Sequence, residues 1–144
     1  MTLYDVWPPV PVAGHFDLAA SPDDATDPSS RGAVQAVARK WCIDRALRPS
    51  TVTTVTALAG EAVSCGHRVG ARGLSLRLRW LDLDRMRIEL SWHGCDAAVL
   101  TRSDAVRSRT GTFDRLADSW GVEVAGSHES FQWFDVDTRT PAHR

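Results

Sequence analysis

The chain has 144 residues, of which 43% are hydrophobic, so it is long enough to bury one core and is expected to form a single domain. Its net charge of −1 lacks the basic excess of a nucleic-acid-binding protein, which favours a protein or a small molecule as partner. No apolar run approaches the roughly 20 residues that cross a bilayer. The first residues lack the basic start and apolar core of a signal peptide, so we expect no membrane association and a cytoplasmic location.

The first thirty residues are rich in Pro, Asp and Ser, a composition typical of a mobile arm. Only residues 15–19 indicate a short strand within this part. We therefore predict a flexible Pro-rich arm at 1–14, one domain at 15–137 and a polar tail at 138–144.

Two amphipathic helices are predicted next. Ser29 or Ser30 can cap a helix over residues 31–46, and Ser50 can cap a second helix over 51–67. The apolar stripe of the second helix consists of Val52, Val55, Ala59, Ala62 and Val63. At 100° per residue, the opposite side carries Thr54, Glu61, Cys65 and Arg68. We therefore expect Glu61 and Cys65 to look away from the centre of the core.

Residues 74–81 and 85–92 alternate between apolar and polar side chains, and the short link between them predicts an antiparallel hairpin. The inward face would carry Leu74, Leu76, Leu78, Trp80, Met86, Ile88, Leu90 and Trp92. The outward face would carry Ser75, Arg77, Arg79, Arg85, Arg87 and Glu89. We expect these mostly like charges to face open water, with an acidic partner as the alternative.

The C-terminal third predicts a loop, a helix and two strands. Residues 93–110 show no sustained period and predict a long loop. A third helix is expected at about 111–120, with Gly121 as its stop, followed by strands at 122–126 and 129–136. This order predicts an α/β (α+β) fold, a two-layer sandwich with helices on one face of a mainly antiparallel mixed sheet.

This order of elements, with its particular residues, resembles the GHKL (histidine kinase-like) ATPase superfamily, and especially the small anti-sigma-factor serine kinases and ATP-binding regulatory proteins of actinobacteria. The likeness covers residues 15–137. It depends on "ARKWCIDRAL" and "STVTTVTALAGEAV" in the two helices, and on "FDRLADSWGVEV" and "SFQWFDVD", which are similar to the family's L-A-x-x-W-G-V ending and closing hairpin. The resemblance implies the histidine kinase-like (Bergerat) fold.

The resemblance also implies a nucleotide site, from which this sequence departs. In the family, the second helix carries a Glu, the presumed general base, and four residues later an Asn that holds Mg²⁺. Glu61 matches the Glu, but Cys65 replaces the Asn, and a soft thiol is a poor ligand for Mg²⁺. The family's adenine-reading Asp, two residues before a Gly, becomes Trp92 before Gly94, and an indole cannot accept that hydrogen bond.

The third nucleotide element of the family is a Gly-rich turn that holds phosphate. Its first glycine corresponds to Arg109, and Gly111 comes two residues late, which leaves too few glycines for a cradle of backbone N–H groups. With all three elements changed, we expect no cofactor and no ATP binding. Glu61 is then expected to be a vestigial catalytic residue, an exposed carboxylate that pairs with Arg68, and Trp92 is expected to fill the adenine space.

Three functions follow from these observations. The leading interpretation is a regulatory pseudokinase or pseudo-anti-sigma factor, not an active enzyme, that binds a sigma factor, a STAS-type antagonist or a paralogous kinase; a homodimer is left open. The second is a working serine kinase that binds ATP and Mg²⁺ at divergent boxes. The third is a soft-metal or redox sensor built from Glu61, Cys65, His93 and Cys95, although three cysteines without a C-x-x-C pair match no zinc motif.

Overall fold

The structure is a computed structural model that describes residues 14–18, 29–68, 70, 73–93, 111–124 and 129–139. The predicted arm before Gly14, the predicted loop after His93 and the tail after Arg139 lie outside the described residues. Among the described residues, no helix has the length and apolarity that a membrane span requires.

Five strands form the sheet of this mixed α/β fold. They are β1 (Gly14–Leu18), β2 (Gly73–Trp80), β3 (Arg85–His93), β4 (Ser119–Val124) and β5 (Glu129–Asp137). Their order is β1-β2-β3-β5-β4, and all four pairings are antiparallel. The antiparallel part of the prediction is therefore confirmed, whereas the expected parallel pairing does not occur among the described strands.

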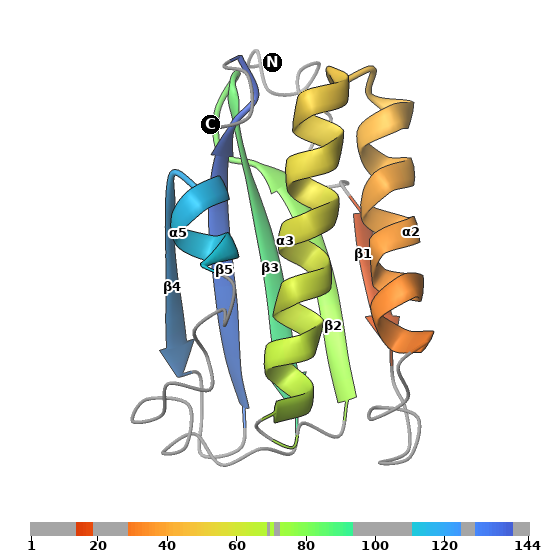
Figure 1. Cartoon of the computed structure of the whole chain (residues 1–144), viewed down its shortest axis with the longest axis vertical. Coiled ribbons are helices and arrows are strands. Elements are labelled where there is room, and N and C mark those ends of the chain that lie inside the picture. Colours follow the sequence, from red (N-terminus) through yellow and green to blue (C-terminus); the bar gives the residue numbers. More distant parts are fainter. Residues whose placement is uncertain are drawn as a thin grey trace, which may run out of the picture.

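The helices α2 (Ser29–Asp44), α3 (Pro49–Arg68) and α5 (Thr112–Leu116) lie on one face of the sheet, which gives the predicted layers (Figure 1). Helices α2 and α3 pack against each other, and α3 also contacts β3, β5 and α5. Helix α2 ends where Ala46 adopts a left-handed φ of 56° and the Leu47 amide donates to the Cys42 carbonyl at 3.1 Å. The predicted helix pair is confirmed within two residues at each end.

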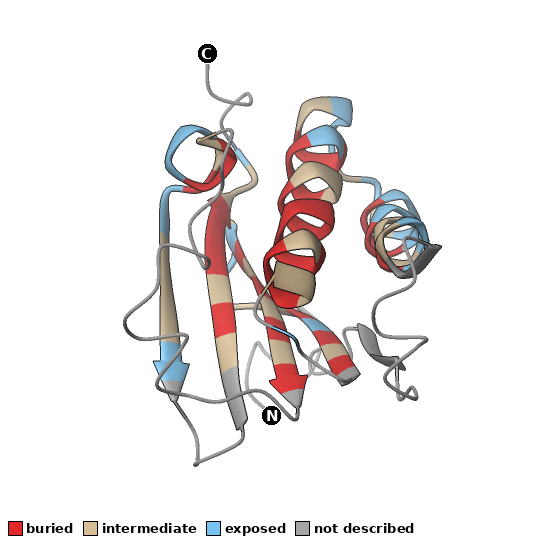
Figure 2. Ribbon diagram, turned by 60° about the horizontal axis from the view of Figure 1, so that its bottom comes forward, coloured by how far each residue is buried: buried red, intermediate tan, exposed pale blue. Residues whose placement is uncertain are grey.

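The β2–β3 hairpin has the predicted register. Leu74 pairs with Trp92, Leu76 with Leu90, Leu78 with Ile88 and Trp80 with Met86. All of these side chains except Trp80 are buried under the helices, as alternation with period two requires. Figure 2 shows the resulting bands of buried and less buried residues along the strands.

The predicted third helix is wrong in its second half. Helix α5 ends at Leu116, Ala117 is extended, and β4 begins at Ser119, so Trp120 and Gly121 belong to a strand. The cause is pairing with β5, since Trp120 is opposite Phe134 and Gly121 is opposite Trp133. Gly121 does not stop a helix here. It makes room for the Trp133 ring, which would lie 2.8 Å from a Cβ at position 121.

None of the six residues predicted for the outer face is buried, as expected, but the arginines there are not unpaired like charges. Glu89 lies 3.2 Å from Arg79 and 3.8 Å from Arg77, measured between carboxylate oxygens and guanidinium nitrogens. Asp135 of β5 pairs in the same way with Arg85 and Arg87. Cross-strand carboxylates therefore neutralise much of the positive charge, so this face gives little support to the acidic-partner alternative.

Candidate functional site

Helix α3 carries the predicted catalytic and metal-binding positions, and it is buried on nearly every side. Thr54, Glu61 and Cys65, expected to look away from the core, are all buried. The expectation of an outward face is therefore wrong. An amphipathic-helix analysis assumes that one side meets solvent, but α3 lies at the centre of the helical layer and contacts both α2 and α5.

Glu61 is held by a residue of the neighbouring helix. Its residue surface is 8% exposed, and its Oε1 lies 3.5 Å from Nη1 of Arg31 in α2. The same guanidinium nitrogen donates a hydrogen bond to the Ser64 hydroxyl. The predicted exposed carboxylate is thus a buried one that ties α3 to α2, and the ion pair with Arg31 was not predicted.

Cys65 is fully buried, and its thiol is already engaged within its own helix. Its Sγ accepts a hydrogen bond from Nη2 of Arg68 at 2.9 Å. A second buried thiol, Cys42 in α2, has its pKa raised to about 12 by burial, partly offset by the nearby charge of Arg45. Cys42 is therefore a protonated core residue at neutral pH.

Trp92 lies at the end of β3 with its indole fully buried against α3. Gly66 is the point of contact: a Cβ at that position would lie 3.1 Å from the indole Nε1 and 3.4 Å from Cδ1. The buried indole N–H of Trp92 has no hydrogen-bond partner among the residues that the structure describes. Gly66 follows Cys65 directly, so three of the predicted site residues, Glu61, Cys65 and Trp92, lie in or against the C-terminal half of α3.

The remaining predicted site residues are only partly described. Gly94, Cys95 and Arg109 lie outside the described residues, as does the side chain of His93. Gly111 precedes α5 with a left-handed φ of 73°, and its carbonyl accepts the Arg115 amide at 3.0 Å. Within the described part of the chain, no three His, Cys, Asp or Glu side chains are grouped as a metal site requires.

The burial of two further polar residues was not predicted. Gln132 of β5 is fully buried on the inner face, between Leu90 of β3 and Val122 of β4 in the sheet. Thr54 is buried in α3, and within the described part of the chain its hydroxyl has no hydrogen-bond partner. The burial of Gln132 could have been predicted from the sequence "SFQWFDVD", where a polar residue stands at an inward position of an alternating strand.

Comparison with known proteins gives no independent assignment, because no family model matches the sequence and no curated protein matches it significantly. Functional inference therefore depends on the geometry around α3 and β3.

The contact between Gly66 and Trp92 leads to the first prediction. Alanine in place of a helical glycine normally stabilises a helix by up to about 1 kcal/mol. Gly66→Ala should instead destabilise the protein by about 1–2 kcal/mol, because the new methyl group overpacks against the indole ring. Chemical denaturation measures the change.

Gly32→Ala is the matched control, since a methyl group added at Gly32 of α2 would meet no atom within 4 Å. It should raise the free energy of unfolding by about 0.5–1 kcal/mol. An equal gain from Gly66→Ala would show that Trp92 does not press against α3.

Proposed function

We propose that this chain is a degenerate member of the GHKL ATPase superfamily that acts as a regulatory protein-binding domain without using nucleotide. Its partner on this proposal is a sigma factor, a STAS-type antagonist or a paralogous kinase. The order of elements, the antiparallel sheet and the helical layer on one face are consistent with the fold that the sequence resemblance implies.

The burial of Trp92 is the observation that carries this proposal. The residue occupies the position of the family's adenine-reading carboxylate, and its indole is packed between β3 and α3 without solvent exposure. Indole resembles adenine in size and aromatic character, and protein interiors are close-packed. A side chain in this position supplies packing that a bound base would otherwise supply and leaves no acceptor for the adenine amino group.

The environment of the other two α3 positions also supports the proposal. Position 65 offers a buried thiol that accepts a hydrogen bond from Arg68, whereas Mg²⁺ requires hard oxygen ligands. The Glu61 carboxylate lies 3.5 Å from the guanidinium of Arg31, so it is held between two helices by a partner within the protein.

A working ATP-dependent serine kinase is the second candidate, and the retained Glu61 favours it. In the resemblance, Glu61 matches the family's general base, and it lies in the half of α3 against which Trp92 of β3 packs. A kinase would need Mg²⁺ to be held by groups other than residue 65.

Isothermal titration calorimetry with ATP and Mg²⁺ separates the two candidates. We expect no binding up to millimolar nucleotide and no rise in melting temperature, because the metal ligand and the adenine acceptor are both replaced. The same titration is made with two variants that restore the family's residues, Trp92→Asp alone and Trp92→Asp combined with Cys65→Asn. Micromolar affinity of the natural chain for ATP would overturn the proposal and favour the kinase.

A further inference from the structure

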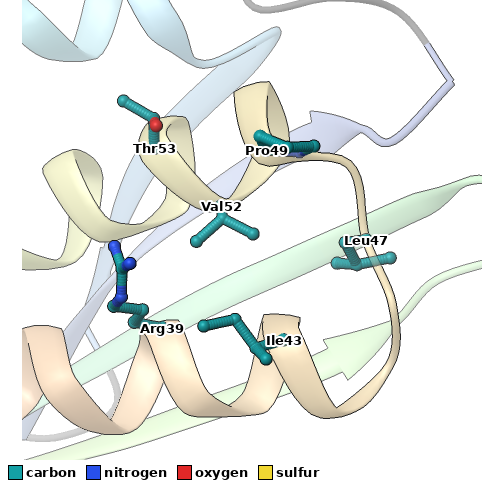
Figure 3. A pocket seen from close by; sticks show the side chains of 6 residues that line it. All are labelled: Arg39, Ile43, Leu47, Pro49, Val52 and Thr53. Carbon is teal, nitrogen blue, oxygen red and sulfur yellow. The ribbon is translucent and has the colours of Figure 1, made fainter.

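A groove lies between the last turns of α2 and the first turns of α3, at the opposite end of α3 from Trp92 (Figure 3). Its volume is about 280 Å³, and it is lined by Arg39, Ile43, Leu47, Pro49, Val52 and Thr53. Figure 3 shows Arg39 and Ile43 extending from α2 towards α3, with Val52 facing them. The groove therefore belongs to the helix–helix junction and not to the region around Glu61, Cys65 and Trp92.

The turn between the helices creates this groove. Only four residues separate the end of α2 at Asp44 from the start of α3 at Pro49. Among them, Ala46 adopts a left-handed conformation. Leu47 lies in this turn, and Ile43 in the last turn of α2 is 53% exposed. Val52, in contrast, is buried and forms the floor. Ile43 therefore adds exposed apolar surface at the edge of the groove.

The open shape and small volume of the groove suit a side chain of another protein. Sites for small molecules usually have volumes of about 300–1,000 Å³ and enclose most of the ligand. At about 280 Å³ and open on one side, this groove fits an aliphatic anchor from a helix or extended segment.

Charge around the groove indicates the chemistry of that segment. Residues 39–53 contain four basic residues and one acidic residue, in a chain whose net charge is −1. The acidic residue, Asp44, is already paired with Lys40 at 2.7 Å, and Arg45 stacks on the Trp41 ring at 4.2 Å. Among the described residues, Arg39 and Arg48 form no ion pair with a carboxylate. Two guanidinium groups thus remain to attract carboxylates.

We infer that this groove binds an acidic segment of a protein partner, with a leucine-like side chain between Ile43 and Val52 and flanking carboxylates on Arg39 and Arg48. This inference builds on the proposed protein-binding role and locates its surface. It does not depend on whether the nucleotide site is lost, because the groove lies at the other end of α3.

The chain offers a direct test, since its only two isoleucines are Ile43 in the groove and Ile88 in the core. The protein is labelled at the isoleucine methyl groups and titrated with a short peptide that has two leucines four positions apart between glutamates. The Ile43 signal should move and saturate, while the Ile88 signal should stay. A matched peptide with lysines in place of the glutamates should bind at least about tenfold more weakly.

Substitutions assign the contacts. Ile43→Ser and Arg39→Glu should each weaken binding of the glutamate peptide by about tenfold. Leu83→Ser is the control for the first, because Leu83 is also 53% exposed but lies in the β2–β3 turn. Arg115→Glu, on the exposed surface of α5, is the control for the second. Both controls should bind like the natural chain.

Several results would overturn the inference. These are no shift of the Ile43 signal with the glutamate peptide, equal binding of both peptides, and equal losses from the control variants.

Sedimentation equilibrium tests whether a second copy of the chain occupies the groove instead. A dimer of the natural chain that Ile43→Ser converts to monomer would assign the groove to that second copy. ATP binding together with the expected peptide binding would refute the loss of nucleotide binding and leave the groove assignment standing.

Discussion

Trp92→Ala is expected to lower the free energy of unfolding by about 3–5 kcal/mol, the usual range for removal of a fully buried large aromatic side chain. The indole fills space between β3 and α3, and it lies so close to Gly66 that a Cβ there would be 3.1 Å from its Nε1. Because the indole N–H has no hydrogen-bond partner, the loss consists of packing and not of a hydrogen bond. Urea denaturation monitored by circular dichroism measures the change.

Two further variants sharpen this test. Trp92→Phe keeps most of the ring volume and removes only the unpaired N–H, so it should cost less than about 2 kcal/mol. Trp133→Ala removes an indole of the same size from the outer face, where the side chain is half-buried, and should cost less than Trp92→Ala. An unchanged melting temperature for Trp92→Ala would contradict the filled pocket and strengthen the kinase alternative.

The hairpin and the two long helices could be predicted because their signals are local. Alternation with period two fixes which side chains of β2 and β3 share a face, and the register follows from the short turn. The i, i+3, i+4 spacing defines the core face of α2 in the same way. Neither prediction required knowledge of distant partners.

The C-terminal end of the third helix could not be predicted correctly, because it depends on pairing with a strand that follows later in the chain. Phe113 and Trp120 fit a helical period, and their rings do pack together, with centroids 5.2 Å apart. Strand β4 also brings Trp120 to the core beside Phe113, so this contact does not require a longer helix. The amide of Asp118 donates to the Asp135 carbonyl at 2.9 Å, and this pairing with β5 outweighs the local preference for helix.

The candidate site was predicted by sequence position, but its environment was not. The family resemblance singled out Glu61 and Cys65 in one half of α3, and period two placed Trp92 on the inner face, where it is found. Burial of Glu61 and its pairing with Arg31 depend on how α2 crosses α3, which no pattern within α3 encodes. The same limitation explains why Asp135 was missed, since its partner Arg87 is 48 residues away in sequence.

Asp135→Ala is expected to be the second most damaging of these changes, at about 2–4 kcal/mol, because it leaves partly buried arginines without their counter-charge. The Asp135 side chain is 4% exposed although it lies on the outer face of the sheet. Arg87 binds it through two nitrogens, Nε at 2.7 Å and Nη2 at 3.0 Å, and Ser119 donates to the same carboxylate at 3.4 Å. Such a two-pronged contact is the strong form of this ion pair.

The network extends beyond the carboxylate. The guanidinium of Arg87 stacks over the Trp133 ring at 4.5 Å, and that ring in turn covers Gly121. The hydrogen bond from Arg87 to Asp135 is also the main cause of the raised pKa of Arg87. Loss of the carboxylate should therefore loosen the pairing of β3, β5 and β4, which amide hydrogen exchange across these strands would report.

Matched variants separate this charge effect from a general loss of packing. Asp44→Ala removes an exposed partner of Lys40 and should change stability by less than about 0.5 kcal/mol. The double variant Asp135→Leu with Arg87→Met replaces both charges with apolar groups and should cost less than the two single changes together, because no unpaired charge is left. Additive losses, or a loss for Asp135→Ala no larger than for Asp44→Ala, would mean that the ion pair does not hold the outer face together.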